Sequence, residues 1–311
     1  MTLRRAAVPA LLLALLLLLS ACAQSADPAE PVIQFVDDNG RTISLAARPT
    51  RVAAVQSSFA DLWQLAGGEV YATSQETFDE GIVELSQDVI NLGSVKTPDL
   101  ETILASGTDF VILSANLADH ADIGEALEGA GVPCAYFDVE TFDDYLRVLQ
   151  IFTDLTDRAD LYEQYGAGVQ ARVQAAIDRK EGQEAPTVLL LRAYSTGVRA
   201  KGSDNMTGAM LKDLGCINIA DSETSLLEDL SLEVILEEDP DFIFVTTMGS
   251  SDEAALASLD ELLLSNPAWE SLTAVQEGRL HLLPKDLFHL KPNERWGESY
   301  EILADYLYGE A

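Results

Sequence analysis

The sequence predicts an α/β protein made of two Rossmann-like lobes, each with a parallel sheet, joined by a single long bridging α-helix. Three observations lead to this prediction. Apolar, strand-like runs alternate with amphipathic helical stretches along most of the chain, which is the pattern of right-handed crossovers between parallel strands. One helix–turn–strand pattern occurs in each half, and a long amphipathic stretch separates the halves.

The repeated pattern is a short amphipathic helix, a turn and a continuous apolar strand. Residues 100–104 and 109–113 form the first copy, and residues 232–236 and 241–245 form the second. Strands without polar alternation are typical of parallel sheets that are covered on both faces. The same architecture is therefore expected twice.

In the first half, a hairpin at residues 32–45 turns at Asp38-Asn39-Gly40 and opens the lobe. Strands and helices then alternate. The expected strands are residues 51–55, 70–73, 110–113 and 134–137, and the expected helices are residues 59–66, 99–105, 123–130 and 142–155.

Residues 158–180 carry apolar side chains at steps of three and four, which predicts one amphipathic helix. At 1.5 Å per residue it is roughly 35 Å long, long enough to lie across two lobes. The alternative is that this helix belongs to one lobe only. In the second half, the expected strands are residues 188–192, 242–246 and 280–283, and the expected helices are residues 205–214, 232–237, 253–264 and 294–307.

The N-terminus has the order of a secretory signal peptide: two arginines, an apolar run at residues 6–19, and Ser20-Ala21-Cys22. The run of about 14 residues is shorter than the roughly 20 that a membrane-spanning helix needs. Leu19-Ser20-Ala21-Cys22 resembles the bacterial lipobox, so Cys22 is the expected site of lipidation. The alternative is an ordinary cleavable signal with a chance cysteine.

These features divide the chain into five expected parts. They are a lipoprotein signal peptide at 1–21, a lipidated N-terminus and flexible leash at 22–31, an N-terminal lobe at 32–157, the bridging helix at 158–181 and a C-terminal lobe at 182–311.

The composition is strongly acidic, with 52 Asp and Glu against 19 Lys and Arg and a formal net charge of −33 at pH 7. Such a surface repels nucleic acid and anionic lipid headgroups. We therefore expect no nucleic-acid partner, and membrane contact only through the N-terminal lipid. Cys134 and Cys216 lie in apolar contexts in different lobes, so they are expected to be buried thiols rather than a disulfide.

Together with the lipobox, the repeat and the bridging helix, four short motifs carry a family resemblance over essentially all of the mature chain. The motifs are Asp38-Asn39-Gly40-Arg41, Pro98-Asp99-Leu100-Glu101, Gly215-Cys216-Ile217-Asn218-Ile219-Ala220 and Gly278-Arg279-Leu280-His281-Leu282-Leu283-Pro284. The chain resembles the iron-siderophore, haem and cobalamin group of ABC transporter substrate-binding proteins.

The resemblance implies two lobes that face each other across a cleft, with little closure because a stiff helix joins them. It implies a monomer, lipid-anchored to the outer face of the bacterial cytoplasmic membrane, that delivers a ferric chelate, haem or a corrinoid to an ABC importer. It also implies that Glu101 and Glu233 pair with arginines of the permease. Both glutamates fall in the first turn of a helix, where the helix dipole favours a carboxylate; the alternative is that they serve the helix alone.

Ligands of parallel α/β sheets bind beyond the carboxyl ends of the strands. This restricts the search to the loops at residues 56–58, 114–116, 193–195, 201–206, 247–249 and 285–296, with Glu140 as a further candidate. The expected ligand-binding residues are Ser57, Ser58, Asn116, Arg192, Tyr194, Lys201, Asn205, Met248, Lys285, His289, Lys291, Arg295 and Trp296.

The loop at residues 285–296 gathers cations beside aromatic residues, which suits an anionic, partly planar chelate. Tyr194 and His289 are the candidate axial ligands for haem. Three alternatives stay open. The charges of this loop balance nearby acids, Trp296 serves packing, and Asn205 caps a helix.

Three other functions compete with this one. A direct zinc or manganese binder needs converging histidines, and the chain has only His120, His281 and His289. An enzyme, such as a cell-surface hydrolase, is disfavoured because no nucleophile elbow, phosphate loop or His-Glu-x-x-His helix occurs. An adhesive lipoprotein would need no cleft between the lobes. We therefore expect no catalytic residue and no metal-ligating residue.

Overall fold

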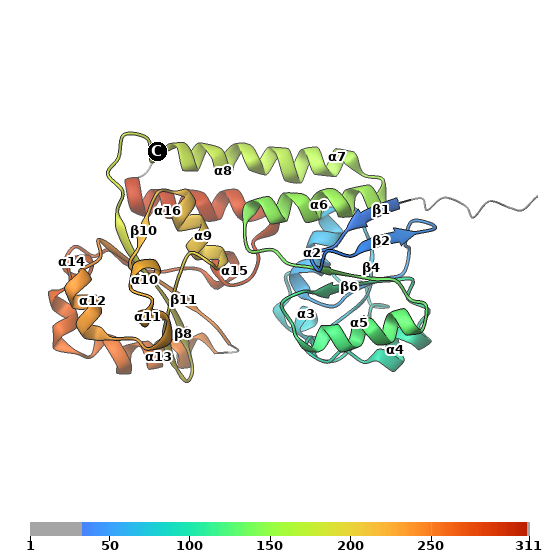
Figure 1. The fold of residues 1–311 in the computed structure, drawn as a ribbon, viewed down its shortest axis with the longest axis horizontal. Coiled ribbons are helices and arrows are strands. Elements are labelled where there is room, and N and C mark those ends of the chain that lie inside the picture. Colours follow the sequence, from blue (N-terminus) through green and yellow to red (C-terminus); the bar gives the residue numbers. More distant parts are fainter. Residues whose placement is uncertain (1–32, 250, 310–311) are drawn as a thin grey trace, which may run out of the picture.

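The computed structural model describes residues 33–249 and 251–309. The chain forms two α/β lobes side by side beneath a layer of long helices (Figure 1). The expected signal peptide, Cys22 and the leash lie outside the described residues. Within the described residues, no helix is both long enough and apolar enough to cross a membrane.

The N-terminal lobe begins with an antiparallel hairpin and continues as a parallel sheet in the order β5-β4-β3-β6-β7. The hairpin turn places Gly40 at φ 74°, in the left-handed region that glycine adopts without strain. The strands are β1 (Ile33–Val36), β2 (Thr42–Leu45), β3 (Val52–Ala54), β4 (Val70–Thr73), β5 (Ile90–Asn91), β6 (Phe110–Ser114) and β7 (Cys134–Phe137). The helices are α2 (Ser57–Leu65), α3 (Gln75–Glu80), α4 (Leu100–Ala105), α5 (Asp119–Gly129) and α6 (Phe142–Thr156).

The C-terminal lobe has a parallel sheet in the order β10-β8-β11-β12, with β9 added antiparallel to β8. Its strands are β8 (Thr187–Tyr194), β9 (Gly197–Lys201), β10 (Ile217–Asn218), β11 (Phe242–Thr247) and β12 (Leu280–Leu282). Its helical segments are α9 (Met206–Asp213), α10 (Ile219–Ser222), α11 (Ser225–Glu228), α12 (Leu232–Glu238), α13 (Asp252–Leu259), η3 (Asp260–Leu264), η4 (Pro267–Ser271), α14 (Thr273–Gln276), α15 (Lys285–Phe288), η5 (Asn293–Arg295) and α16 (Trp296–Tyr308).

Strand β9 is absent from the elements expected from the sequence. Its signal was present, because Val198 and Ala200 are buried while Arg199 between them is exposed. This alternation is typical of a strand with one covered face. The stretch is only five residues long and is followed by Gly202, so its alternation is a weak local signal.

The internal repeat is confirmed, since α4 leads into β6 and α12 leads into β11. Both copies also share a hydrogen-bonded corner. The Asp109 carboxylate accepts the backbone N–H groups of Thr50 (3.0 Å) and Arg51 (2.8 Å). In the second copy, the Asp241 carboxylate accepts the Thr187 N–H (2.8 Å) and hydroxyl (2.9 Å). In each lobe, an aspartate before the repeated strand therefore fixes the start of the strand beside it.

The bridge is one continuous helical stretch made of α7 (Ala159–Tyr162), a π-helical turn η2 (Glu163–Ala167) and α8 (Gly168–Asp178). Figure 1 shows it above α6 of the N-terminal lobe and α16 of the C-terminal lobe. The Tyr145 hydroxyl on α6 donates to the Tyr165 carbonyl at 2.8 Å, and Arg172 on α8 pairs with Glu301 on α16 at 2.7 Å. The helix therefore contacts both lobes, which excludes the alternative that it belongs to one.

The apolar core has three parts. One cluster covers the outer face of the N-terminal sheet, and another covers the outer face of the C-terminal sheet. The third runs without interruption from the inner face of one sheet, beneath the bridging helix, to the inner face of the other. Phe142 and Tyr145 meet Trp296 at this junction, with ring centroids 5.8 and 6.3 Å away. The lobes are thus packed against each other on one side of the molecule.

Candidate functional site

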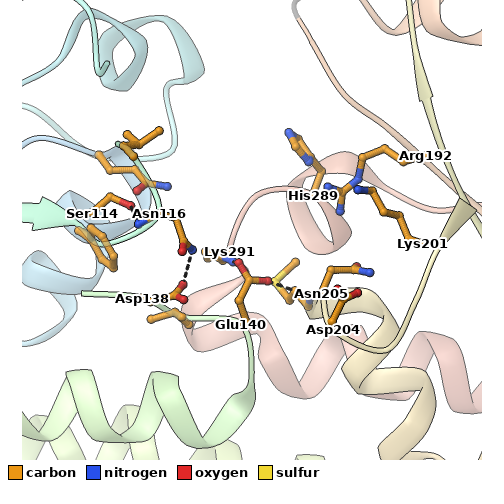
Figure 2. A pocket seen from close by; sticks show the side chains of 15 residues that line it. Ser114, Asn116, Asp138, Glu140, Arg192, Lys201, Asp204, Asn205, His289 and Lys291 are labelled. Atoms are coloured by element: carbon orange, nitrogen blue, oxygen red, sulfur yellow. Dashed lines mark hydrogen bonds and ion pairs between the residues drawn. The ribbon is translucent and has the colours of Figure 1, made fainter. Parts of the chain in front are cut away.

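A cavity of about 510 Å³ opens between the two lobes (Figure 2). The side chains that line it follow the carboxyl ends of strands, as the rule for parallel sheets predicts. From the N-terminal lobe they are Gln56, Phe59, Ser114, Asn116, Leu117, Asp138, Val139 and Glu140. From the C-terminal lobe they are Arg192, Lys201, Asp204, Asn205, Met206, His289 and Lys291.

The wall formed by the N-terminal lobe is acidic. Asp138 follows β7 directly, and its carboxylate accepts the Asn116 amide at 2.5 Å. Burial raises the pKa of Asp138, and the nearby charge of Glu140 adds to this effect. This wall therefore offers hydrogen-bond acceptors and negative charge to the cavity.

The wall formed by the C-terminal lobe is basic. Arg192 near the end of β8 and Lys201 at the end of β9 lie beside His289 (Figure 2). The Arg192 Nε and the His289 Nδ1 are buried and have no hydrogen-bond partner among residues 33–249 and 251–309. In the described part of the chain, no ion pair involves Arg192 or Lys201. These donors are available to an anionic group in the cavity.

His289 differs from its neighbours in charge. Burial lowers the pKa of His289 to about 4, and the positive charges of Arg192, Lys285 and Lys291 act in the same direction. The imidazole is therefore neutral near pH 7. A neutral imidazole can accept as well as donate a hydrogen bond, and it can ligate a metal.

Glu140 belongs to the N-terminal lobe, but its carboxylate contacts residues of the C-terminal lobe. One carboxylate oxygen accepts the Lys291 ammonium at 2.9 Å, and the other accepts the Met206 N–H at 3.0 Å, at the start of α9. The Asn205 side chain caps the same helix by accepting the Gly208 N–H at 3.4 Å. The Glu140 carboxylate thus takes the place that an anion would occupy at a helix N-terminus beside a lysine.

A second contact joins the lobes outside the cavity. The Asn293 amide donates to the Ser58 carbonyl at 2.9 Å and to the Asp61 carboxylate at 2.6 Å. Burial raises the pKa of Asp61 to about 6, against the hydrogen bond from Asn293, and the charge of Glu294 contributes further. Asn293 is buried and has φ 47°, a conformation that asparagine tolerates better than most residues.

The structure brings six of the expected ligand-binding residues to the cavity. They are Asn116, Arg192, Lys201, Asn205, His289 and Lys291. They come from both lobes and from separate loops, so their proximity depends on the fold. Asn205 combines a place on the cavity wall with the helix-capping role that the sequence left open.

The other seven expected residues do not line this cavity, and their contacts explain why. The Ser57 hydroxyl donates to Glu80, and Ser58 contributes its carbonyl to the contact with Asn293. Tyr194 pairs with Gly197 in the turn between β8 and β9. Met248 lies exposed in the loop after β11.

The remaining three belong to the loop at residues 285–296. The Lys285 ammonium bonds to the Gly249 carbonyl and lies 3.4 Å from Asp252. Arg295 pairs with Asp286 and Glu298, so both cations are balanced by nearby acids. Trp296 is fully buried at the junction of the lobes and therefore serves packing.

The cavity is also lined by residues outside the list of expected ligand-binding residues. Glu140 was a further candidate, and Gln56, Ser114, Asp204 and Met206 lie in loops that the search included, whereas Phe59, Leu117, Asp138 and Val139 fall outside every expected loop. Asp138 could have been chosen, because it is the first polar residue after an apolar strand. The apolar residues carry no local signal that separates a cavity wall from a core.

In residues 33–249 and 251–309, no group of three or more His, Cys, Asp and Glu side chains is placed to hold a metal ion. The three histidines lie apart. His120 Nε2 is 2.7 Å from the Val95 carbonyl, His281 stacks on Tyr306 at 3.9 Å, and His289 alone lines the cavity.

Two α/β lobes, a helix that joins them and a cavity between their strand ends define a two-lobed substrate-binding protein. A model of the family described as "Periplasmic binding protein" matches residues 52–287. The chain belongs to this family, whose members are extracytoplasmic binding proteins rather than enzymes. Among curated proteins, none matches the chain.

Solved structures share the fold at low sequence identity. A TroA-like periplasmic binding protein, FepB from Veillonella parvula, has 17% identity and a TM-score of 0.70, over 89% of this chain and 90% of that one. The triscatecholate siderophore binding protein FeuA from Bacillus subtilis, complexed with ferri-bacillibactin, has 17% identity and a TM-score of 0.67, over 89% and 99%. A periplasmic heme binding protein from Pseudomonas aeruginosa has 21% identity and a TM-score of 0.67, over 85% and 94%.

Proposed function

We propose that this protein captures an iron chelate, either a ferric siderophore or haem, or else a corrinoid, and delivers it to an ABC importer. The observation that carries the proposal is the cavity between the lobes, where Arg192 and Lys201 have no carboxylate partner among the described residues. Cations that face a cleft and make no ion pair of their own favour a ligand that brings oxyanions. The names of the siderophore and heme binders with the same fold support the same class of ligand.

We further propose that the protein is a monomeric lipoprotein, held through Cys22 at the outer face of the cytoplasmic membrane. The order of arginines, apolar run and lipobox-like tetrad supports this location. More than one acyl chain is needed for stable anchoring. Replacing Cys22 with serine should release the protein from membranes in a bacterial host and abolish incorporation of a labelled fatty acid.

Docking on the permease is assigned to Glu101 and Glu233. Each is exposed in the first turn of the corresponding repeat helix, α4 or α12. The two helices lie on different lobes (Figure 1), which suits a partner with two equivalent basic patches. Reversing both charges to arginine should abolish uptake and leave ligand affinity unchanged. Normal transport by the double variant would exclude this docking role.

The ligand class is tested by titrating the protein with ferric siderophores, haem and cobalamin and following tryptophan fluorescence. Replacing Arg192 with alanine should weaken binding of the preferred chelate about 10- to 100-fold, the loss expected for charge-assisted hydrogen bonds in a buried site. Arg199→Ala is the matched control, because Arg199 is the registered neighbour of Arg192 on β9 but is exposed and outside the cavity. Quenching by free ferric or zinc ion, but by none of the chelates, would overturn the proposal.

A further inference from the structure

The formal charges around the cavity cancel near pH 7. Arg192, Lys201 and Lys291 supply three positive charges, and Asp138, Glu140 and Asp204 supply three negative ones. His289 is neutral there, because burial and the adjacent cations hold its pKa at about 4. The lining therefore has no net positive charge that would attract a ligand of high negative charge.

The charges are also separated in space. Figure 2 shows Asp138 on the N-terminal side, Arg192, Lys201 and Asp204 on the opposite side, and the paired Glu140 and Lys291 between them, so the first side keeps an excess negative charge and the second an excess positive charge. A site with an acidic wall and a basic wall is complementary to a ligand with the reverse arrangement. A ligand with anionic groups all around it would meet repulsion from the acidic wall.

Glu140 changes what the basic wall can offer. Its carboxylate already pairs with Lys291 at 2.9 Å and accepts the first N–H of α9 at 3.0 Å. An anionic ligand could use these two groups only by displacing Glu140, which would leave a partly buried carboxylate without its partners. Arg192 and Lys201 remain as the lining cations that make no ion pair within the described chain.

Asp138, by contrast, needs hydrogen-bond donors or a positive charge from the ligand. Its carboxylate accepts the Asn116 amide at 2.5 Å, and no cation lies within ion-pair distance of it in the described residues. A carboxylate accepts more than one hydrogen bond. A ligand that brings N–H or O–H donors, or an ammonium group, to this side would satisfy it.

We propose that Asp138 and Glu140 make the cleft selective for a polarised chelate of low net charge. Such a chelate presents oxyanion groups to Arg192 and Lys201 and hydrogen-bond donors to the acidic wall. The inference rests on the proposed function and narrows its ligand class. Among ferric chelates, it favours a trihydroxamate of neutral or single positive charge over a tricatecholate of charge −3.

The test compares three probes by isothermal titration calorimetry. They are a neutral ferric trihydroxamate, a ferric trihydroxamate that carries one ammonium group, and a ferric tricatecholate of charge −3. We expect the wild-type protein to bind both trihydroxamates at least about tenfold more tightly than the tricatecholate, since like-charge contacts are the usual means of rejecting a wrong ligand.

Glu140→Gln should reduce this preference about tenfold, because it removes one negative charge and frees Lys291 while its amide oxygen can still accept from Met206. Asp138→Asn should remove any advantage of the ammonium-bearing probe and leaves the Glu140–Lys291 pair intact. Asp143→Asn is the matched control, because Asp143 is an exposed carboxylate in the first turn of α6 and lies outside this cavity. Thermal unfolding of each variant verifies that it is folded.

Two results would overturn the inference and leave the proposed function standing. One is a wild-type protein that binds the tricatecholate as tightly as the trihydroxamates. The other is a Glu140→Gln variant in which all three affinities change by the same factor. If no ferric chelate, haem or corrinoid binds to any variant or to the wild type, the proposed function fails as well.

Discussion

The two lobes share a frame but differ in the wall that each presents to the cleft. Asp109 and Asp241 make equivalent hydrogen bonds at equivalent corners, so the repeat extends to the ties between neighbouring strands. The walls differ because β9 is paired with β8 in the C-terminal lobe and brings Lys201 to the cavity. In the N-terminal lobe, Asp138 follows β7, which pairs with β6 as β12 pairs with β11 at the far edge of the C-terminal sheet. The strands and helices that the two lobes share therefore determine where the site forms. The residues that differ between the lobes determine its charge.

The lobes also contribute differently to the junction between them. The C-terminal lobe supplies Trp296, which is fully buried, and the N-terminal lobe supplies Phe142 and Tyr145 around it. Because the inner core runs through this junction, we expect the two lobes to unfold as one unit.

The largest effect should follow from breaking that junction. Trp296→Ala should lower the free energy of unfolding by about 3–5 kcal/mol, the usual loss for a large aromatic side chain in a core. It should also separate unfolding into two transitions in calorimetry, because the lobes lose their shared packing. Trp269→Ala is the control, since Trp269 is 2% exposed but lies in the outer core of the C-terminal lobe. A single transition for Trp296→Ala would show that the lobes are coupled elsewhere.

A smaller change in the free energy of unfolding is expected from the partly buried carboxylate of Asp61 in the N-terminal lobe. Burial raises the pKa of Asp61 to about 6, above the 3.8 of an exposed aspartate. The folded state therefore binds a proton before the unfolded state does, and stability should rise as pH falls from about 7 toward 4. Asp61→Asn should stabilise the protein at pH 7 by about 1–2 kcal/mol and remove this slope. Denaturant unfolding between pH 4 and 8 measures it.

Asp122→Asn, on the exposed face of α5, is the control for the change of charge alone. An Asp61→Asn variant with the pH dependence of the wild type would mean that this carboxylate is solvated in solution.

His289, on the C-terminal wall, should make stability depend on pH in the opposite direction to Asp61. Burial lowers the pKa of His289 to about 4. Between about pH 6.5 and 4 the unfolded state takes up a proton that the folded state excludes, so this residue costs stability as pH falls. His289→Gln should remove about 1–2 kcal/mol of that loss at pH 4.5. A steeper loss of stability in the variant than in the wild type would contradict the assignment.

The smallest expected effect is the slow alkylation of the two described cysteines, Cys134 and Cys216. Burial raises the pKa of the Cys216 thiol to about 12, and burial also raises the pKa of the Cys134 thiol. Since the thiolate is the reactive form, iodoacetamide should label neither residue quickly at pH 7.5 in the folded protein. Mass spectrometry should find Cys216 labelled first, because it is only half-buried while Cys134 is fully buried in β7. Rapid labelling of Cys134 would indicate local opening of the N-terminal sheet.

Local patterns predicted the frame well. Apolar runs gave the parallel strands, and steps of three and four gave the bridging helix, because the periods of strands and helices depend on neighbouring residues. The same reasoning misplaced part of the site. Lys285 and Arg295 are close in sequence to Lys291, yet they point to different partners, because side-chain direction within a loop depends on where the loop packs.

The sequence by itself determined the two lobes, the repeat and the helix between them. The tertiary structure decided which charges face the cleft and which are used internally. Glu140 pairs with Lys291, 151 positions away in the chain, and Asn293 contacts Ser58 and Asp61 from the opposite lobe. Electrostatic and hydrogen-bond energies depend on separation in space, and that separation is set only when the lobes are packed against each other.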